Sequence, residues 1–271
     1  EGVKLIAQEL KDKGPDVLVV ITPHGPVFKD AVAINMLPLL EGSFKQFGAG
    51  QVKFKIPNQI DLVERIIHYQ VSQGISITVL DEDLSREYGV SSKLDHGSLV
   101  PLYFIQKAGL VIPVVHITMG MLPREELYIF GSILQKAVQD SSYQVAVLAS
   151  GDLSHRLTPD APVGFNAQGQ VFDLTVKKLV GQTDVFRLME LPASLVDQAG
   201  ECGFRPLIML LGCLDGYSFE AKVLSYEGPF GVGYMTAAFL PQGQTEERML
   251  VETLMEKRNL RINRVRQEES S

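Results

Sequence analysis

A short run of apolar, mostly β-branched residues near the start of the chain constrains the fold most strongly. Residues 17–21 are Val-Leu-Val-Val-Ile, and Gly14, Pro15 and Asp16 precede them and end the helical pattern of residues 1–13. An uninterrupted run of this kind is typical of a strand buried on both faces, because a half-exposed strand alternates apolar and polar residues. The run therefore predicts a parallel or mixed sheet covered by helices.

Strand-like and helix-like segments alternate along the rest of the chain, which is typical of the α/β class. Apolar runs predict further strands at residues 76–80, 111–117, 145–149 and 231–240. Amphipathic patterns predict helices at 61–72, 124–138 and 173–179, and residues 206–214 form an apolar helical pattern. We predict a single α/β domain over residues 1–241, with a mixed or parallel sheet flanked by helices.

Beyond residue 241 the composition changes. Residues 242–271 begin with a polar stretch, continue with a charged, helix-like segment at 246–258, and end with little apolar content. We interpret them as a linker or docking helix for a fused or associated C-terminal domain, with a solvated tail as the alternative. The chain begins with Glu1 inside a helical pattern, so we expect a cut end rather than a natural start.

Charge and cysteine content exclude several classes of function. The chain has 25 Lys and Arg against 32 Asp and Glu, a net charge of −7 and a pI near 5.3. This balance argues against nucleic-acid and anionic-membrane partners, and no apolar run approaches the ~20 residues that a membrane span needs. Cys202 and Cys213 are the only two cysteines and have no metal-type spacing, which argues against a disulfide-stabilised fold and a zinc ribbon. We therefore expect a protein of the reducing cytoplasm. GxSxG, CxxC and Walker-type motifs are absent from the sequence.

Three histidines follow turn-rich or strand-end segments and are candidate site residues. His24 and His155 come shortly after predicted strands, where open α/β sheets place their ligands, and Gly151 would let the backbone approach a ligand closely. His96 precedes a predicted helix that Asp95 or Ser98 is expected to cap. Each histidine also has a plainer interpretation as a turn residue.

The other two histidines are predicted to lie outside the site. His116 is flanked by apolar residues in a strand pattern, which indicates a structural histidine, and His68 is expected at the surface of an amphipathic helix.

Glu201 is the best-placed carboxylate, between glycines before an apolar helix. It is predicted either to ligate a metal or to stabilise the N-terminus of that helix. Two histidines and one carboxylate form the ligand set of non-haem Fe(II) centres, although spacing does not choose between iron and zinc. The sequence leaves open whether Cys202 replaces or assists a ligand.

Together these motifs resemble the class III extradiol ring-cleavage dioxygenases of the LigB-like superfamily, which also contains the Memo proteins. The matching segments occur in the family's order and approximate spacing, at residues 15–24, 94–97, 100–102, 150–155 and 200–201. The resemblance covers most of residues 15–240 and implies a LigB-like fold.

The resemblance also implies a metal ion held by two histidines and a glutamate, with two further histidines beside the substrate. His24 resembles the second metal-ligating histidine and Glu201 the carboxylate ligand. His155 resembles the acid–base histidine, and His96 resembles its partner on the substrate and oxygen side. Asp95 and Asp152 are then expected to orient these rings. Fe(II) is the expected metal, and Zn(II) or another divalent ion is the alternative.

The chain departs from the family pattern at one ligand. The family's first metal histidine lies on an N-terminal strand upstream of the helix with which this chain begins, and no residue here matches it. We therefore expect that strand to be missing and metal affinity to be weakened. Residues 225–234 look closest to a branch found with Memo-type and radical-SAM partners, in which ring cleavage is not a general property and a C-terminal domain can be fused.

Three functions follow as hypotheses. The first is Fe(II)-dependent oxidative ring cleavage of a catechol-type aromatic diol by O2. The alternative is a Memo-like metal- or ligand-binding partner protein without ring-cleavage activity. The third is metal-assisted hydrolysis, which bound zinc would favour. A homo-oligomer is compatible with each of them.

Overall fold

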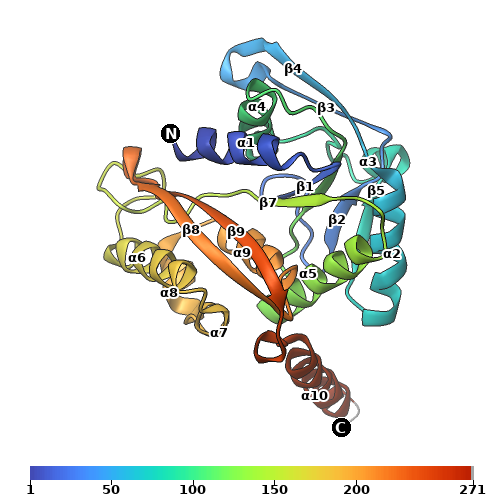
Figure 1. Cartoon of the computed structure of the whole chain (residues 1–271). Coiled ribbons are helices and arrows are strands. Elements are labelled where there is room, and N and C mark those ends of the chain that lie inside the picture. The colour runs from blue at the N-terminus through green and yellow to red at the C-terminus, as the bar shows by residue number, and fades with distance from the viewer. Residues whose placement is uncertain (270–271) are drawn as a thin grey trace.

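The computed structural model describes residues 1–269, apart from the side chains of residues 72 and 264–269, and has a five-stranded mixed sheet at its centre (Figure 1). The strand order is β5-β2-β6-β1-β7, formed by β1 (Val17–Thr22), β2 (Val32–Asn35), β5 (Ile77–Leu80), β6 (Val114–Thr118) and β7 (Val145–Ala149). β1 is parallel to β6 and to β7, whereas β2 is parallel to β5 and antiparallel to β6. The predicted α/β class with a mixed sheet is confirmed.

The apolar run at residues 17–21 lies inside this sheet as β1, and all of its residues are buried. Its side chains alternate between two hydrophobic clusters, with Val19 and Ile21 in one and Leu18 and Val20 in the other. Full burial of an aliphatic side chain contributes about 1.5–3 kcal/mol, so both faces of β1 stabilise the fold.

Helices cover both faces of the sheet (Figure 1). One face packs against α2 (Ile60–Gln73), α5 (Arg124–Gln139) and α9 (Phe204–Gly212). The other packs against α1 (Gly2–Lys13), α4 (His96–Lys107) and the hairpin of β3 (Leu39–Phe44) and β4 (Ala49–Pro57), which is joined by the short helix η1 (Lys45–Phe47). A further short helix, α3 (Glu82–Glu87), follows β5.

Helices α5 and α9 approach each other so closely that their contact requires glycine. A Cβ atom on Gly131 would lie 2.1 Å from the carbonyl oxygen of Met209. A Cβ atom on Gly212 would lie equally close, at 2.1 Å, to the carbonyl oxygen of Tyr128. The two backbones are therefore in direct contact.

A second group of elements lies beside the sheet: α6 (Ala167–Gly181), α7 (Val185–Met189), α8 (Ala193–Ala199) and the long hairpin of β8 (Tyr217–Glu227) and β9 (Tyr234–Gln244), which turns at η2 (Pro229–Gly231) (Figure 1). Two backbone hydrogen bonds join the hairpin to the loop after β7. Leu153 N donates to Gly233 O at 2.8 Å, and Gly233 N donates to Ser154 O at 2.8 Å. The hairpin therefore supports the loop that carries Asp152 and His155.

The C-terminal segment forms η3 (Glu246–Arg248) and α10 (Val251–Glu269), whose first turns pack against α5 at the end of the protein where the chain terminates (Figure 1). Leu254 is buried, and Arg258 donates to Gln73 O at 2.8 Å and lies 3.8 Å from the Glu126 carboxylate. Since β9 continues to Gln244, the domain boundary at residue 241 stays a prediction, and the last two residues of the predicted tail lie outside the described residues. Among the described helices, none has the length and apolarity that crossing a membrane requires.

Candidate functional site

Side chains from four segments meet near the carboxyl ends of β1 and β7. His24 follows β1, Asp152 and His155 follow β7, His96 begins α4, and Cys202 lies between α8 and α9. Because β1 and β7 are parallel neighbours, their carboxyl ends share one edge of the sheet, where α/β proteins bind ligands. The structure thus brings together four of the predicted site residues and adds Cys202.

His24 and His96 form a stacked pair. Their ring centroids lie 4.3 Å apart at an interplanar angle of 25°. Burial, together with the charge of His96, lowers the pKa of His24, which favours the neutral imidazole that metal ions bind. His96 also makes an edge contact with the exposed Phe47 ring, with the two ring centroids 5.8 Å apart.

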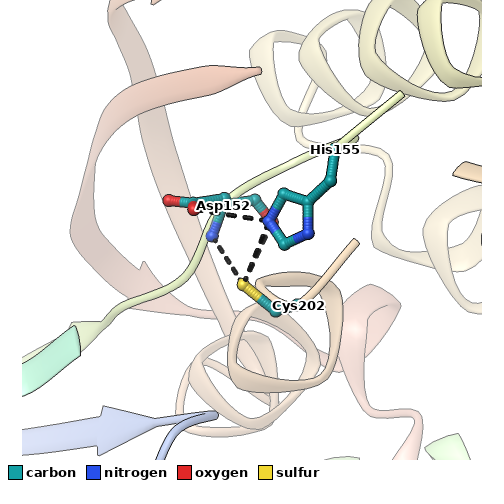
Figure 2. A group of neighbouring side chains, drawn as sticks. All are labelled: Asp152, His155 and Cys202. Atoms are coloured by element: carbon teal, nitrogen blue, oxygen red, sulfur yellow. Dashed lines mark hydrogen bonds and ion pairs between the residues drawn. The ribbon is translucent and has the colours of Figure 1, made fainter. Parts of the chain in front are cut away.

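Asp152, His155 and Cys202 form the second half of the site (Figure 2). His155 Nε2 lies 3.3 Å from Asp152 Oδ2 and 3.8 Å from Cys202 Sγ. The same sulfur lies 3.6 Å from His24 Nε2 and accepts a hydrogen bond from Asp152 N at 3.1 Å. Burial raises the pKa of the Cys202 thiol to about 12.

The spacing of these donor atoms fits a metal ion. Zinc-type bonds of roughly 2.0–2.3 Å to nitrogen, oxygen and sulfur place neighbouring donors roughly 3–4 Å apart. One atom each from Asp152, His155 and Cys202 lies within 4.8 Å of the others, and His24 Nε2 borders the sulfur. Asp152, His155 and Cys202 therefore offer one carboxylate, one imidazole and one thiol donor close enough to share an ion, and His24 adjoins them through the sulfur.

Two glycines allow the loops that carry these donors to touch. Gly151 has a φ of +146°, and a Cβ atom there would lie 2.4 Å from Gly203 Cα. Asp152 O accepts hydrogen bonds from Gly203 N at 2.8 Å and from Cys202 N at 3.3 Å. Gly151 was expected to let the backbone approach a ligand, and the group that it approaches here is the Gly203 backbone.

The Glu201 side chain contacts the start of α9, whereas the side chain of its neighbour Cys202 contacts the site histidines. Its Oε2 accepts a hydrogen bond from Phe204 N at 2.6 Å, in the first turn of α9, and burial raises the pKa of the carboxyl group. This contact matches the helix-stabilising interpretation of Glu201, while its role as a metal ligand stays a prediction. The side chain of Cys202 is the one in this loop that contacts both His24 and His155.

Asp95 caps α4 and lies in a buried hydrogen-bond network. Its carboxylate accepts from Thr22 Oγ1 at 2.7 Å and from Ser98 N at 3.2 Å, and His116 Nε2 lies 3.3 Å away. Burial acts to raise the pKa of Asp95, but the interactions with His116, Thr22 and Ser98 outweigh it and hold that pKa well below its usual range. Asp95 was expected to orient the site rings, and the imidazole that it contacts among the described residues is that of His116.

The two histidines predicted to lie outside the site are also placed. His116 is buried in β6, as expected of a structural histidine, and His68 is exposed on α2. The contact of His116 with Asp95 could not be predicted from the sequence, since no local pattern links a strand residue to a helix cap 21 positions away.

A family model matches most of this chain, and known proteins resemble it in sequence or in fold. A family described as the catalytic LigB subunit of aromatic ring-opening dioxygenase matches residues 1–237. Protein CA_C1420 of Clostridium acetobutylicum is 38% identical over 234 residues, which are 86% of this chain and 50% of that protein. This chain thus spans about half the length of that relative.

A second relative and a solved structure extend the comparison. The 3,4-dihydroxyphenylacetate 2,3-dioxygenase of Escherichia coli is 27% identical over 241 residues, 83% of each chain. The crystal structure of the uncharacterized protein JW3007 from Escherichia coli K12 has a TM-score of 0.62 at 17% identity, covering 88% of this chain and 91% of that one. The latter shows a shared fold.

Proposed function

This chain belongs to the LigB family, described as the catalytic subunit of aromatic ring-opening dioxygenases, and on that premise we propose that it cleaves the ring of a catechol-type substrate with O2. The observation that carries the proposal is the convergence of His24, His155, Asp152 and Cys202, with neighbouring donor atoms 3.3–3.8 Å apart. The relative named for 3,4-dihydroxyphenylacetate supports an aromatic diol as substrate. We propose Fe(II) as the metal, with Zn(II) as the alternative.

His24 is a proposed ligand, because its Nε2 faces the thiol and burial lowers the pKa of its imidazole, which favours the neutral form that binds metal. Glu201 or Cys202 is the second proposed ligand that this chain supplies to the metal ion. A carboxylate beside imidazoles suits Fe(II), whereas a thiolate suits zinc. A bound divalent ion would supply Lewis acidity toward the diol hydroxyls and, as iron, chemistry with O2. The additional histidine upstream of residue 1 stays a prediction from the resemblance.

The ligand assignment is tested by comparing Glu201→Gln with Cys202→Ser, using Cys213→Ser as the control for a cysteine outside the cluster. The variant that removes a true ligand is expected to lose most of its Fe(II) and Zn(II) affinity, measured by competition with a chelator. Unchanged affinity in both variants would contradict ligation from this loop.

His155 is the proposed acid–base residue. Its Nε2 points toward the cluster, and Asp152 Oδ2 at 3.3 Å stabilises the imidazolium that forms when His155 takes a proton from a substrate hydroxyl. His96 stacks on His24 and contacts the exposed Phe47 ring, and we propose that these rings contact the aromatic substrate.

Oxygen uptake by the Fe(II)-loaded protein with 3,4-dihydroxyphenylacetate and other catechols tests the reaction. His155→Ala is expected to lower the rate about 10²–10⁴-fold and to leave metal affinity unchanged, with His68→Ala as the surface control. Equal loss of turnover and of metal binding would instead identify His155 as a ligand.

A second candidate is a metal-binding partner protein without ring cleavage. The Cys202 thiol between His24 and His155 favours it, because a soft sulfur donor suits metals other than a dioxygenase iron. Tight metal binding without oxygen uptake by any catechol would support this candidate over the first.

A further inference from the structure

A buried network of polar side chains adjoins the His24–His96 pair. Ser98 Oγ donates to Asp95 Oδ2 at 3.0 Å, and Thr22 Oγ1 donates to Asp95 Oδ1 at 2.7 Å. His116 Nε2 lies 3.0 Å from Ser98 Oγ and 3.3 Å from Asp95 Oδ2. The network therefore joins the end of β1, the middle of β6 and the first turn of α4.

The backbone of each histidine of the pair is held by one member of this network. His24 N donates to Thr22 Oγ1 at 3.2 Å, and His96 follows Asp95, the N-cap of α4. Gly97 follows His96 and packs against β1 and His24, because a Cβ atom there would lie 2.8 Å from Thr22 Oγ1 and 3.0 Å from His24 Cδ2. Because Gly97 has no side chain, the first turn of α4 lies directly against Thr22 and His24, so a shift of that turn relative to β1 would change the spacing of the two rings.

The environment of His116 indicates what its imidazole does. The side chain is buried, and its Nδ1 has no hydrogen-bond partner among the described residues. Burying an unpaired polar atom is unfavourable, and an apolar residue in this strand would avoid that cost. A histidine at position 116 therefore differs favourably from an aliphatic residue only in the contact of its Nε2 with Ser98 and Asp95, and we infer that this contact is its role.

We propose that His116 is a positioning residue, which through Ser98 and Asp95 holds His24 and His96 in their stacked arrangement for the chemistry of the site. Without the imidazole, the first turn of α4 shifts relative to β1 and the rings separate. The consequences for metal binding and turnover rest on the proposed function, whereas the arrangement of the rings does not.

The test compares His116→Leu, His116→Gln and Val115→Ala in the full chain. Val115→Ala is the matched control, because Val115 is a buried neighbour in β6 whose side chain packs in the cluster on the opposite face of the sheet. Imidazole ¹H–¹⁵N spectra of the metal-free proteins report on the rings of His24 and His96, and Fe(II) titration reports on the site.

His116→Leu is expected to shift both ring signals and to lower Fe(II) affinity about 10- to 100-fold. His116→Gln keeps an N–H donor near the Nε2 position and is expected to retain the wild-type ring signals and Fe(II) affinity. Val115→Ala is expected to lower thermal stability while leaving the ring signals of the wild type.

The inference is wrong if folded His116→Leu keeps wild-type ring signals, or if Val115→Ala shifts them equally. Should His116→Leu fail to fold, Thr22→Val replaces it, because valine keeps the shape of threonine and lacks the hydroxyl that binds Asp95. Unchanged ring signals in that variant would also overturn the inference. If the wild type takes up no oxygen but His116→Leu still shifts the ring signals, the proposed function is wrong and the positioning role of His116 stands.

Discussion

Replacing Gly151 by alanine is expected to separate the two loops that hold the candidate site. The new Cβ atom would lie 2.4 Å from Gly203 Cα, whereas ordinary contacts begin at 3.4 Å, so the backbones must move apart by about 1 Å. That movement stretches the hydrogen bonds from Gly203 N and Cys202 N to Asp152 O, and the one from Asp152 N to Cys202 Sγ, past useful length.

The expected cost follows from these contacts. Loss of two or three hydrogen bonds costs about 1 kcal/mol each, and alanine at this positive φ adds about 1–2 kcal/mol of strain. The free energy of unfolding should therefore fall by roughly 3–5 kcal/mol, which lowers the Tm by roughly 6–20 °C for a chain of this size. Fe(II) affinity should fall about 10- to 100-fold, because the donor atoms lose their spacing.

Thermal unfolding followed by circular dichroism, together with a metal titration, measures both effects. Gly164→Ala is the matched control, since Gly164 also has a positive φ, +77°, but a Cβ atom there would meet none of the described atoms within 4 Å. If Gly151→Ala is no less stable than Gly164→Ala, crowding against Gly203 does not constrain these loops and the reasoning is refuted.

Three further perturbations test the fold. Gly131→Ala should lower the free energy of unfolding by about 1–3 kcal/mol, because its Cβ atom would meet Met209 O at 2.1 Å, and an unchanged urea midpoint would contradict the close contact of α5 and α9. Burial raises the pKa of Asp215, so its contribution to the stability of the wild type should be lost as pH rises from about 3.9 through that raised pKa. Asp215→Asn, which keeps the acceptor for Leu250 N, should lack this loss of stability, and an equal pH dependence of the free energy of unfolding in both proteins would contradict the prediction. Leu254→Ala should reduce hydrogen-exchange protection in α10 by about 2 kcal/mol while leaving that of β1 unchanged, and unaltered protection in α10 would show that Leu254 does not anchor it.

Elements with a strong local signal were predicted well from the sequence. The strand predicted at residues 145–149 is β7 with the same bounds, and the helix predicted at 124–138 ends one residue later. The strand predicted from residue 111 begins only at Val114, because Val111 is 73% exposed and Pro113 precedes the ladder. Helix α6 begins six residues before the predicted position, where Asn166 caps it.

Other elements depend on partners that a local pattern does not reveal. β2 has four residues, and its place between β5 and β6 follows from tertiary pairing. β8 was missed because most of its residues are half-exposed and its stability comes from pairing with β9. Strand propensity is a weak guide in such segments, since cross-strand contacts decide the outcome.

The grouping of His24 with His155 followed from one rule, that parallel strands end at the same edge of a sheet. Which side chain of the 201–202 loop faces them did not follow, because it depends on the turn that begins at Gly200, whose φ is +61°. The roles of Glu201, His96 and His155 in metal binding and catalysis stay predictions.

The wide sequence separation of the site residues also affects how the protein folds. His24 and Cys202 lie 178 residues apart, so their contact closes a long loop, and we expect it to form late in folding. During synthesis the first donor leaves the ribosome long before the last one exists. Metal is therefore expected to enter a nearly finished protein, and the moment at which the Cys202 thiol becomes shielded from an alkylating reagent marks the completion of folding.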